Sequence, residues 1–144
     1  GRMIIRPITS ADQERLLLIE EELHDNEVQK RKELLEARLG SKGTNSLLIE
    51  QTGNIVAYLL ATEVQHSSSA SKESLSLLRL AVRPAYQGQG YGSILIAALK
   101  DLAVQKEKKA IWIDCSEDML SYFAQQGFRD EGESDVGIHM VWEL

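Results

Sequence analysis

Apolar and polar positions alternate along the chain in periods that predict short strands and amphipathic helices. Residues 3–8 form an apolar segment that predicts a first strand. Within residues 16–23, and again within residues 28–39, apolar side chains recur at the spacing of one helix face, and Gly40 ends the second segment. The chain is therefore expected to begin with one strand and two helices.

Three more strands are predicted to follow. Residues 46–51 and 54–64 are apolar segments separated by a Thr-Gly hairpin signal. Residues 65–74 are polar and serine-rich, which predicts an exposed connection. Residues 75–82, LSLLRLAV, are too continuously apolar for a strand with one face in water, so we expect a central strand buried on both faces.

The second half of the chain continues the alternation of helices and strands. Residues 93–108 have a helical pattern, residues 110–114 predict another buried strand, and residues 119–126 predict a short helix that ends at Gly127. Two further strands finish the chain. The predicted order is βααβββαβαββ, an α/β fold with a mixed sheet covered by helices, in one domain that spans residues 3–144.

Charge and hydropathy narrow the range of partners. The chain has 144 residues, a formal net charge of −6 and no long run of lysine and arginine. Nucleic-acid binding needs clustered cations, so no nucleic-acid partner is expected. The acidic balance favours a positively charged substrate. No apolar run is long enough to cross a bilayer and no signal-peptide pattern precedes the first strand, so no membrane partner is expected.

Cysteine usage bears on redox chemistry and on metals. Cys115 is the only cysteine, which excludes an internal disulfide and a cysteine-based zinc site, and no metal site is predicted. A reducing cytoplasm is the expected location. Gly1 and Arg2, ahead of Met3, have the character of a residual expression tag and are left out of the predicted domain.

Three glycines stand at alternate positions between the predicted central strand and the following helix. The stretch VRPAYQGQGYGSILIAAL carries them at positions 88, 90 and 92. Successive backbone N–H groups in such a turn form a concave anion site, and glycine lets a phosphate approach closely. Gln87–Gly92 is therefore predicted to cradle a pyrophosphate, although a glycine turn without a ligand and a nucleotide-binding module stay open at this point. The P-loop pattern is absent, and Ser93 breaks the G-x-G-x-x-G pattern.

At the same residues the sequence resembles a known family. Gln87-Gly88-Gln89-Gly90-Tyr91-Gly92 follows the pattern [QR]-x-x-G-x-[GA], and LAVRPAYQGQGYGSILI resembles the acetyl-coenzyme A motif of the GNAT acetyltransferase superfamily. The later stretch IDCSEDMLSYFAQQGFRDEGES, followed by VWEL, resembles the C-terminal part of arylalkylamine N-acetyltransferases and their bacterial relatives. The resemblance covers nearly the whole chain.

The resemblance implies direct transfer of an acetyl group from acetyl-coenzyme A to an amine, without a covalent enzyme intermediate. It implies that backbone N–H groups of the glycine turn hold the pyrophosphate and that an N–H near Leu80 polarises the thioester carbonyl. It also implies that the central strand and Ser116 face the pantetheine arm. The implied cofactor-binding residues are Leu80, Ala81, Val82, Gln87, Gly88, Gln89, Gly90, Tyr91, Gly92, Ser93 and Ser116.

The family's usual acid and base are missing from their positions. Many members carry a Glu or His base on the central strand, at positions that align with Ser76 and Leu78 here. The usual acid, a tyrosine four residues before a Gly-Phe pair, aligns with Phe123. Transfer could then rely on water and on positioning, which alone can supply roughly 7–11 kcal/mol.

Acid and base could also lie elsewhere on the chain. The candidates are Tyr122, Glu73 and His139, with Glu117 as a further carboxylate. Cys115 could attack a thioester, but no histidine is visibly paired with it, so a small buried hydrophobe is the expected role.

The sequence thus predicts an N-acetyltransferase that uses acetyl-coenzyme A and acts on a primary amine of a small, cationic molecule. The alternative is a non-catalytic acyl-coenzyme A sensor or interaction domain, suggested by Ser76, Leu78 and Phe123. A homodimer is a further expectation from the superfamily.

Overall fold

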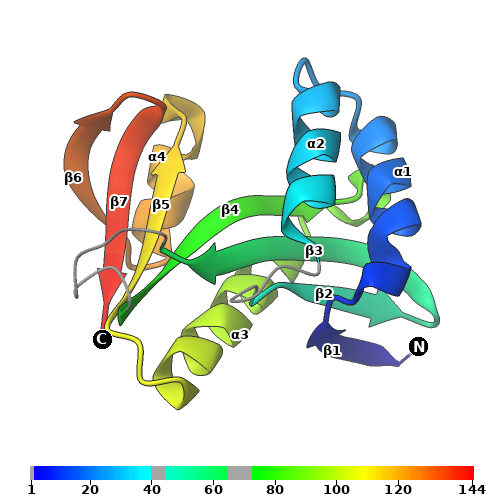
Figure 1. Cartoon of the computed structure of the whole chain (residues 1–144), viewed down its shortest axis with the longest axis horizontal. Coiled ribbons are helices and arrows are strands. Elements are labelled where there is room, and N and C mark those ends of the chain that lie inside the picture. Colours follow the sequence, from blue (N-terminus) through cyan, green and yellow to red (C-terminus); the bar gives the residue numbers. More distant parts are fainter. Residues whose placement is uncertain (1, 40–44, 65–72) are drawn as a thin grey trace. The chain divides into compact units, whose positions relative to one another are not determined.

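The computed structural model describes residues 2–39, 45–64 and 73–144 of the chain (Figure 1). The strands are β1 Met3–Pro7, β2 Leu47–Gln51, β3 Asn54–Glu63, β4 Ser74–Val82, β5 Ala110–Cys115, β6 Arg129–Ser134 and β7 Gly137–Glu143. The helices are α1 Gln13–Leu23, α2 Val28–Arg38, α3 Tyr91–Gln105 and α4 Glu117–Gln125, with short 3-10 turns η1 Ser10–Asp12 and η3 Pro84–Tyr86. The order confirms the predicted βααβββαβαββ. The predicted helix end at Gly40 and residues 65–72 of the predicted connection lie outside the described residues.

The strands form a mixed sheet, as predicted. Their hydrogen-bonded order is β1-β2-β3-β4-β5-β7-β6, which places β4 in the middle. Strands β4 and β5 run parallel, while β1 with β2, β2 with β3, β5 with β7 and β6 with β7 are antiparallel. A parallel pair needs a crossover, and α3 supplies the crossover between β4 and β5.

The residues group into two compact units, and each is described by itself. Unit 1 consists of the described residues of Gly1–Leu60 and Arg79–Leu95, and unit 2 of those of Ala61–Leu78 and Ile96–Leu144. Strands β3 and β4 and helix α3 contribute residues to both units. The single domain expected from the sequence stays a prediction.

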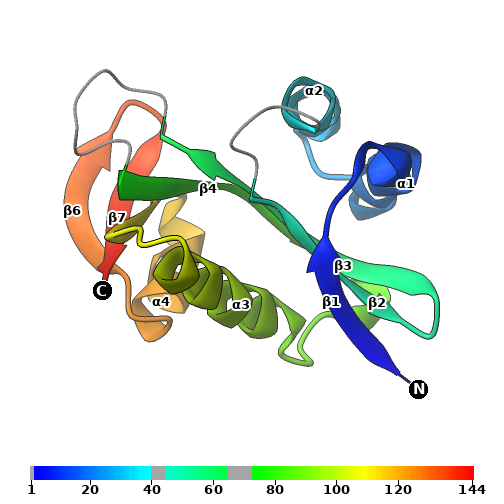
Figure 2. The ribbon, with the colours of Figure 1, turned by 60° about the horizontal axis from the view of Figure 1, so that its bottom comes forward.

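Unit 1 is built around helices α1 and α2. Figure 2 shows the two helices nearly end-on, next to each other on one side of β2 and β3. Leu16 and Ile19 of α1 and Leu35 of α2 are buried, which fits the helical spacing of apolar residues in the sequence. Glu20 of α1 is buried as well, so the helix also turns a carboxylate toward the core.

Strand β4 differs from the expected strand buried on both faces. Leu75, Leu77 and Ala81 are buried, but Leu78 and Leu80 are only half-buried. The ladder with β5 runs from Ser74 opposite Ala110 to Leu77 opposite Ile113, and β4 continues beyond it to Val82. The expectation was therefore wrong for the second half of the strand, which extends past the ladder with β5.

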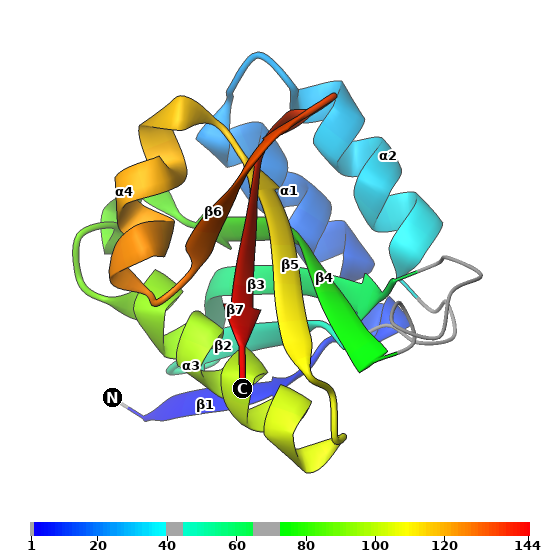
Figure 3. The same cartoon turned by 90° about the vertical axis from the view of Figure 1, so that its left-hand side faces the viewer.

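Unit 2 contains β5, β7 and β6 side by side (Figure 3). Helix α4 packs against all three strands. The core of unit 2 includes Ile111, Ile113, Phe123, Phe128 and Met140. Within the described residues of the chain, no helix combines the length and apolar character needed to cross a membrane.

Candidate functional site

The glycine turn of unit 1 presents an open backbone. Gly88 has φ +75° and Gly90 has φ +87°, in the left-handed region that side chains other than glycine rarely adopt. A Cβ placed on either glycine would meet no atom within 4 Å. The sequence therefore uses glycine here for its backbone conformation, and the turn leaves room for a ligand to approach its amides.

Helix α3 begins inside the predicted cradle. The backbone N–H of Ile94 donates to the carbonyl of Gly90 at 3.0 Å, which closes the first helical turn. The helix thus starts at Tyr91, two residues earlier than the predicted start at Ser93. The N–H groups of Tyr91 and Gly92 lie at the helix N-terminus, where backbone donors lack intrahelical acceptors and the dipole favours an anion.

Two side-chain amides of the turn donate hydrogen bonds to backbone carbonyls that precede it. The Gln87 Nε2 group donates to the Val82 carbonyl at 3.0 Å, and the Gln89 Nε2 group donates to the Ala85 carbonyl at 3.3 Å. These bonds tie the turn back to the end of β4 and to η3. The shape of the cradle is therefore set by contacts within the turn itself.

Unit 1 brings most of the predicted cofactor-binding residues into one continuous stretch. Ala81 is buried and Val82 half-buried at the end of β4, immediately before η3 and the glycine turn. Ser116 belongs to unit 2 instead, where it is exposed and is the N-cap residue of α4. Its predicted role at the pantetheine arm stays a prediction.

A histidine and an aspartate pair across two strands of unit 2. Asp114 of β5 lies directly opposite His139 of β7, and the Asp114 Oδ1 to His139 Nδ1 distance is 3.1 Å. The Ser134 hydroxyl lies 3.0 Å from the same carboxylate oxygen. An ionised carboxylate can only accept, so Nδ1 carries the proton and the Nε2 atom of the neutral imidazole is left as the acceptor. This arrangement suits a general base.

The sequence singled out His139 but missed its partner. Asp114 is the one charged residue in β5, AIWIDC. A carboxylate in an otherwise apolar strand is a sequence feature that could have marked it as a candidate functional residue. Its pairing with His139 depends on the register between β5 and β7, which are separated by α4 and β6 along the chain. That register could not be derived from spacing alone.

The aromatic residues of α4 occupy different environments. Phe123 is 3% exposed and packs edge-to-face against Phe128, with 5.6 Å between ring centroids. Phe123, which aligns with the tyrosine that serves as general acid in the family pattern, therefore lies in the core of unit 2. Tyr122 is half-buried, and its ring packs edge-to-face against Phe123.

Tyr122 and His139 lie on opposite sides of the β5–β7 ladder. His139 and Trp142 are three residues apart in β7, and alternate residues of a strand point to opposite faces. A Cβ on Gly127, which follows α4, would lie 3.4 Å from Trp142 Cδ1, so α4 covers the face of Trp142. The structure therefore does not bring these two candidates together.

Glu73 lies apart from the histidine as well. Its Oε2 atom is 3.2 Å from Lys109 Nζ, and it precedes Ser74, which lies opposite the first residue of β5. His139 lies opposite Asp114, four residues further along β5, or about 13 Å at the usual rise of a strand. Glu73 forms an exposed ion pair at the other end of this strand.

Cys115 has the environment of a structural side chain. It is 6% exposed, and its Sγ atom lies 3.6 Å from Met140 Sδ. Burial raises the pKa of the thiol, and the nearby carboxylates of Asp114 and Asp130 raise it further. The thiol is therefore protonated at neutral pH, which agrees with the predicted role as a small buried hydrophobe.

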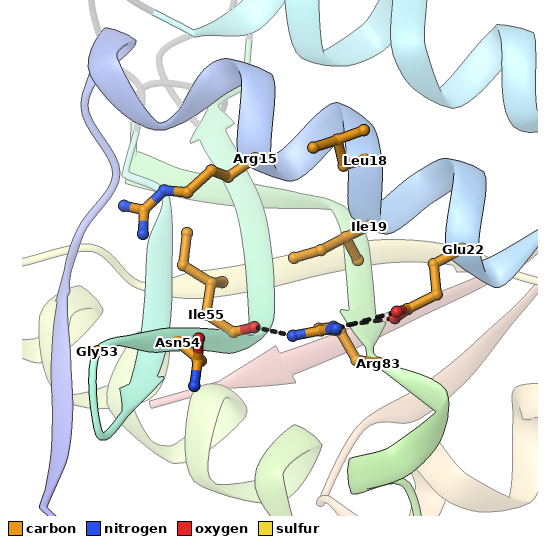
Figure 4. Close-up of a pocket in the computed structure, with 8 residues that line it drawn as sticks. All are labelled: Arg15, Leu18, Ile19, Glu22, Gly53, Asn54, Ile55 and Arg83. Carbon is orange, nitrogen blue, oxygen red and sulfur yellow. Dashed lines mark hydrogen bonds and ion pairs between the residues drawn. The ribbon is translucent and has the colours of Figure 1, made fainter.

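Unit 1 also contains a cavity between α1 and the β2–β3 turn (Figure 4). It has a volume of about 200 Å³. Its lining residues are Arg15, Leu18, Ile19, Glu22, Gly53, Asn54, Ile55 and Arg83. Arg83 and Glu22 form an ion pair at one end of it, and Arg83 is also the residue that precedes η3. The cavity thus borders the segment that leads into the glycine turn.

The chain is similar to acetyltransferases. A protein-family model with the description "Acetyltransferase (GNAT) family" matches residues 12–128 of the chain. A putative GNAT acetyltransferase from Desulfovibrio desulfuricans is 15% identical, with a TM-score of 0.83 over 99% of both chains. The PaiA N-acetyltransferase from Thermoplasma acidophilum, solved with coenzyme A, is 15% identical, with a TM-score of 0.77 over 100% of both chains. A GNAT acetyltransferase from Brucella melitensis, solved with acetyl-CoA, is 19% identical, with a TM-score of 0.78 over 99% of this chain and 88% of that one.

Proposed function

Because the chain belongs to the GNAT acetyltransferase family, we propose that it transfers an acetyl group from acetyl-coenzyme A to the primary amine of a small cationic molecule. The glycine turn is the observation that carries this proposal. It places open backbone donors and the N-terminus of α3 next to the end of β4. Such a constellation is suited to a diphosphate.

The residues of the turn fit the charge and size of that group. Residues 83–93 include no aspartate or glutamate, so no carboxylate of this segment opposes an anion. The open space around the Cβ positions of Gly88 and Gly90 lets phosphate oxygens approach the amides. Acetyl-coenzyme A supplies the acetyl group in activated form, as a thioester.

Strand β4 is assigned to the arm between the diphosphate and the thioester. Leu80, Ala81 and Val82 lie at the end of β4, ahead of η3 and the turn, and their backbone groups would hold the pantetheine. An N–H near Leu80 would donate to the carbonyl oxygen at which negative charge develops. One donor of this kind is worth roughly 3 kcal/mol of transition-state stabilisation.

His139 is assigned as the base that takes the proton of the amine. The pairing with Asp114 fixes the ring and its tautomer, so that Nε2 can accept a proton. The carboxylate would then stabilise the imidazolium that forms. Asp114 is thus a positioning residue, and Ser134 holds its carboxylate in turn. Tyr122 and Glu73 stay predictions for the acid and for a second base.

Two features support a small cationic acceptor. The net charge of −6 favours the approach of a cation. The stretch from Ile113 to Ser134, followed by VWEL at residues 141–144, resembles the C-terminal part of arylalkylamine N-acetyltransferases, which act on amines of this kind. Release of the coenzyme A thiol across a panel of aryl and alkyl amines, polyamines and peptide N-termini tests the assignment.

The cradle is tested with two matched variants, Gly90→Glu and Gly53→Glu. Both glycines have a positive φ, +87° and +83°, and a Cβ on either meets nothing within 4 Å. Both variants therefore share the same backbone strain and the same added charge. We expect Gly90→Glu to abolish coenzyme A binding in calorimetry, because it puts a carboxylate where the diphosphate lies, and Gly53→Glu to bind normally.

The outcomes separate the parts of the proposal. Equal coenzyme A affinity of folded Gly90→Glu and wild type would overturn the cradle. Binding of coenzyme A without thiol release on any amine would overturn the transferase activity and would leave an acyl-coenzyme A-binding protein. Turnover confined to peptide N-termini would keep the activity and replace the acceptor class.

A further inference from the structure

Three consecutive glutamates near the end of α1 contact three different parts of the chain. Glu21 pairs with Lys32 of the neighbouring helix α2, at 2.6 Å. Glu20 and Glu22 instead pair with arginines on either side of residues 80–82. The two outer carboxylates thus connect α1 to the segment of β4 that is assigned to the cofactor.

The pair between Glu20 and Arg79 is buried and bidentate. Arg79 Nε lies 3.0 Å from Glu20 Oε2, and Arg79 Nη2 lies 2.8 Å from Glu20 Oε1. The Tyr58 hydroxyl of β3 also donates to Glu20 Oε2. The Glu20 and Arg79 side chains are only 1% and 14% exposed. A bidentate pair with little access to water holds the two backbones in a defined geometry.

Tyr58 stays a hydrogen-bond donor in this cluster. Burial raises the pKa of its phenol, and the charge of Glu20 raises it further, so the hydroxyl keeps its proton at neutral pH. Its ring is fully buried in β3. Glu20 is therefore held from β3 and β4 together.

The pair between Glu22 and Arg83 is also bidentate but more exposed. Both N–O distances are 2.9 Å, and Arg83 Nη1 donates to the Ile55 carbonyl at 3.2 Å (Figure 4). The Arg83 carbonyl accepts the N–H of Tyr86 at 2.8 Å, which forms the turn η3. Arg83 is thus tied to α1 by its side chain while its backbone starts the connection to the glycine turn.

The two arginines stand at the two ends of residues 80–82. The paired register of β4 with β5 covers Ser74 to Leu77, so these residues lie beyond that ladder. Apart from the neighbouring strand β3, the placement of their backbone therefore depends on other contacts. Arg79 supplies one such contact just before the segment, and Arg83 supplies the other just after it.

We propose that Glu20 and Glu22 are positioning residues for acetyl transfer, each acting through its arginine on one end of residues 80–82. The inference rests on the proposed function, which gives these residues a cofactor to hold. Arg79 adjoins Leu80, which is assigned to the thioester, so Glu20 governs the rate of transfer. Arg83 leads into the cradle, so Glu22 governs the affinity for coenzyme A.

The Glu22 arm is tested by calorimetry with coenzyme A and by steady-state kinetics on the best amine. Glu22→Gln is expected to raise the Kd about three- to fivefold, the scale of an exposed bidentate pair, and to leave kcat unchanged. Glu21→Gln is the matched control, because it removes the neighbouring carboxylate and its pair with Lys32.

The Glu20 arm is tested by the opposite split between kcat and Kd. Glu20→Gln is expected to lower kcat about tenfold with the Kd unchanged, because small misplacement of a reacting group slows transfer. Tyr58→Phe removes only the phenol donor and keeps the ring in the core. It is expected to lower kcat about threefold, the scale of one hydrogen bond. This variant keeps the test decisive if Glu20→Gln does not fold.

Failure of this inference is distinguishable from failure of the proposed function. Wild type that neither binds coenzyme A nor releases thiol overturns both. Wild type that binds and turns over, while Glu22→Gln and Glu21→Gln have the same Kd, overturns the role of Glu22 alone. Loss of kcat and rise of Kd by the same factor in both Tyr58→Phe and Glu22→Gln would indicate a general loosening of unit 1 and would overturn the division of roles.

Discussion

At the scale of single residues, the environment of Cys115 separates direct transfer from a two-step route. A thiolate is the nucleophile in a two-step route, and burial next to Met140 raises the pKa of this thiol. His139 does not activate it, since His139 lies opposite Asp114, and Cys115, the next residue of β5, points to the other face of the ladder. The structure therefore favours direct attack of the amine, as the family resemblance implies.

The variant Cys115→Ala is expected to keep the turnover of the wild type. The same change should lower the free energy of unfolding by about 1 kcal/mol, because a small buried side chain is lost from the core. Thiol release and urea unfolding measure the two effects. A folded Cys115→Ala protein without activity would instead favour a covalent intermediate.

The variant His139→Gln is expected to lower kcat/KM by about 100-fold, the usual contribution of a general base. Asp114→Asn should cause a smaller loss, because it removes the orienting carboxylate and keeps the imidazole. His24→Gln is the control, since His24 lies at the exposed end of α1 in unit 1. Unchanged kcat/KM in His139→Gln would leave the amine proton to water or to Glu73.

Features that depend on the local backbone could be predicted, and contacts that depend on distant pairing could not. The left-handed conformation of Gly88 and Gly90 was predictable, because glycines at alternate positions between a strand and a helix indicate an unusual turn. Glu20 and Arg79 carried a signal, a charge on the buried face of a helix and another within an apolar strand. Their contact spans 59 positions, and no spacing rule connects them.

At the scale of elements, hydrophobic periodicity gave the type and order of every helix and strand within the described ranges, whereas helix starts were less accurate. Helix α3 begins at Tyr91 rather than Ser93, and α4 begins at Glu117 rather than Met119. In each case the first turn contains glycine or acidic residues, which hydrophobic periodicity does not register. The error matters for α3, because its first turn forms part of the proposed cradle.

The end of α4 was predicted correctly at Gly127, and the structure shows why. Gly127 has φ +91°, its N–H donates to the Ala124 carbonyl, and the N–H of Phe128 donates to the Phe123 carbonyl, both at 3.0 Å. This pair of bonds is a Schellman motif, which needs a left-handed residue after the helix. It also turns Phe128 back toward the core of unit 2, beside Phe123.

The variant Gly127→Ala is expected to lower the free energy of unfolding by about 2 kcal/mol. A left-handed alanine costs roughly 1–2 kcal/mol, and its Cβ would lie 3.4 Å from Trp142 Cδ1, at the short end of ordinary van der Waals contact. Gly132→Ala is the control, because Gly132 has φ +106° and nothing within 4 Å of its Cβ position. Equal losses in the two variants, measured by urea unfolding, would show that the contact with Trp142 adds nothing.

At the scale of the whole molecule, the family model and the similar structures confirm the fold that the element order predicts. The order of strands in the sheet was not available from the sequence. It depends on the pairing of β4 with β5, which α3 separates along the chain. It also depends on β7 lying between β5 and β6 in the sheet. Such pairings are decided by long-range packing, which apolar periodicity along the chain does not encode.

One charged cluster joins the first strand, the first turn and the second strand. Arg6 of β1 donates to Asp12 at 2.8 and 2.9 Å and to Glu50 of β2 at 2.7 and 3.1 Å. The Thr9 N–H also donates to Asp12, at 2.8 Å. The pKa of Asp12 therefore lies well below its usual range, chiefly because of the hydrogen bonds from Arg6, which together with Thr9 outweigh the opposing effect of burial. Because of this cluster, the free energy of unfolding is expected to change with pH in the acid range.

The direction of this dependence follows from the lowered pKa of Asp12 in the folded chain. The carboxylate contributes its full stabilisation above the pKa of the unfolded chain, about 3.9, and loses it as the pH falls toward the folded value. Asp12→Asn should therefore lower the free energy of unfolding by about 2 kcal/mol at neutral pH, and by progressively less below about pH 4. Asp101→Asn, on the exposed side of α3, is expected to keep the acid dependence of the wild type. Urea unfolding from neutral to acid pH measures all three proteins, and a parallel decline of wild type and Asp12→Asn would contradict the role of this cluster.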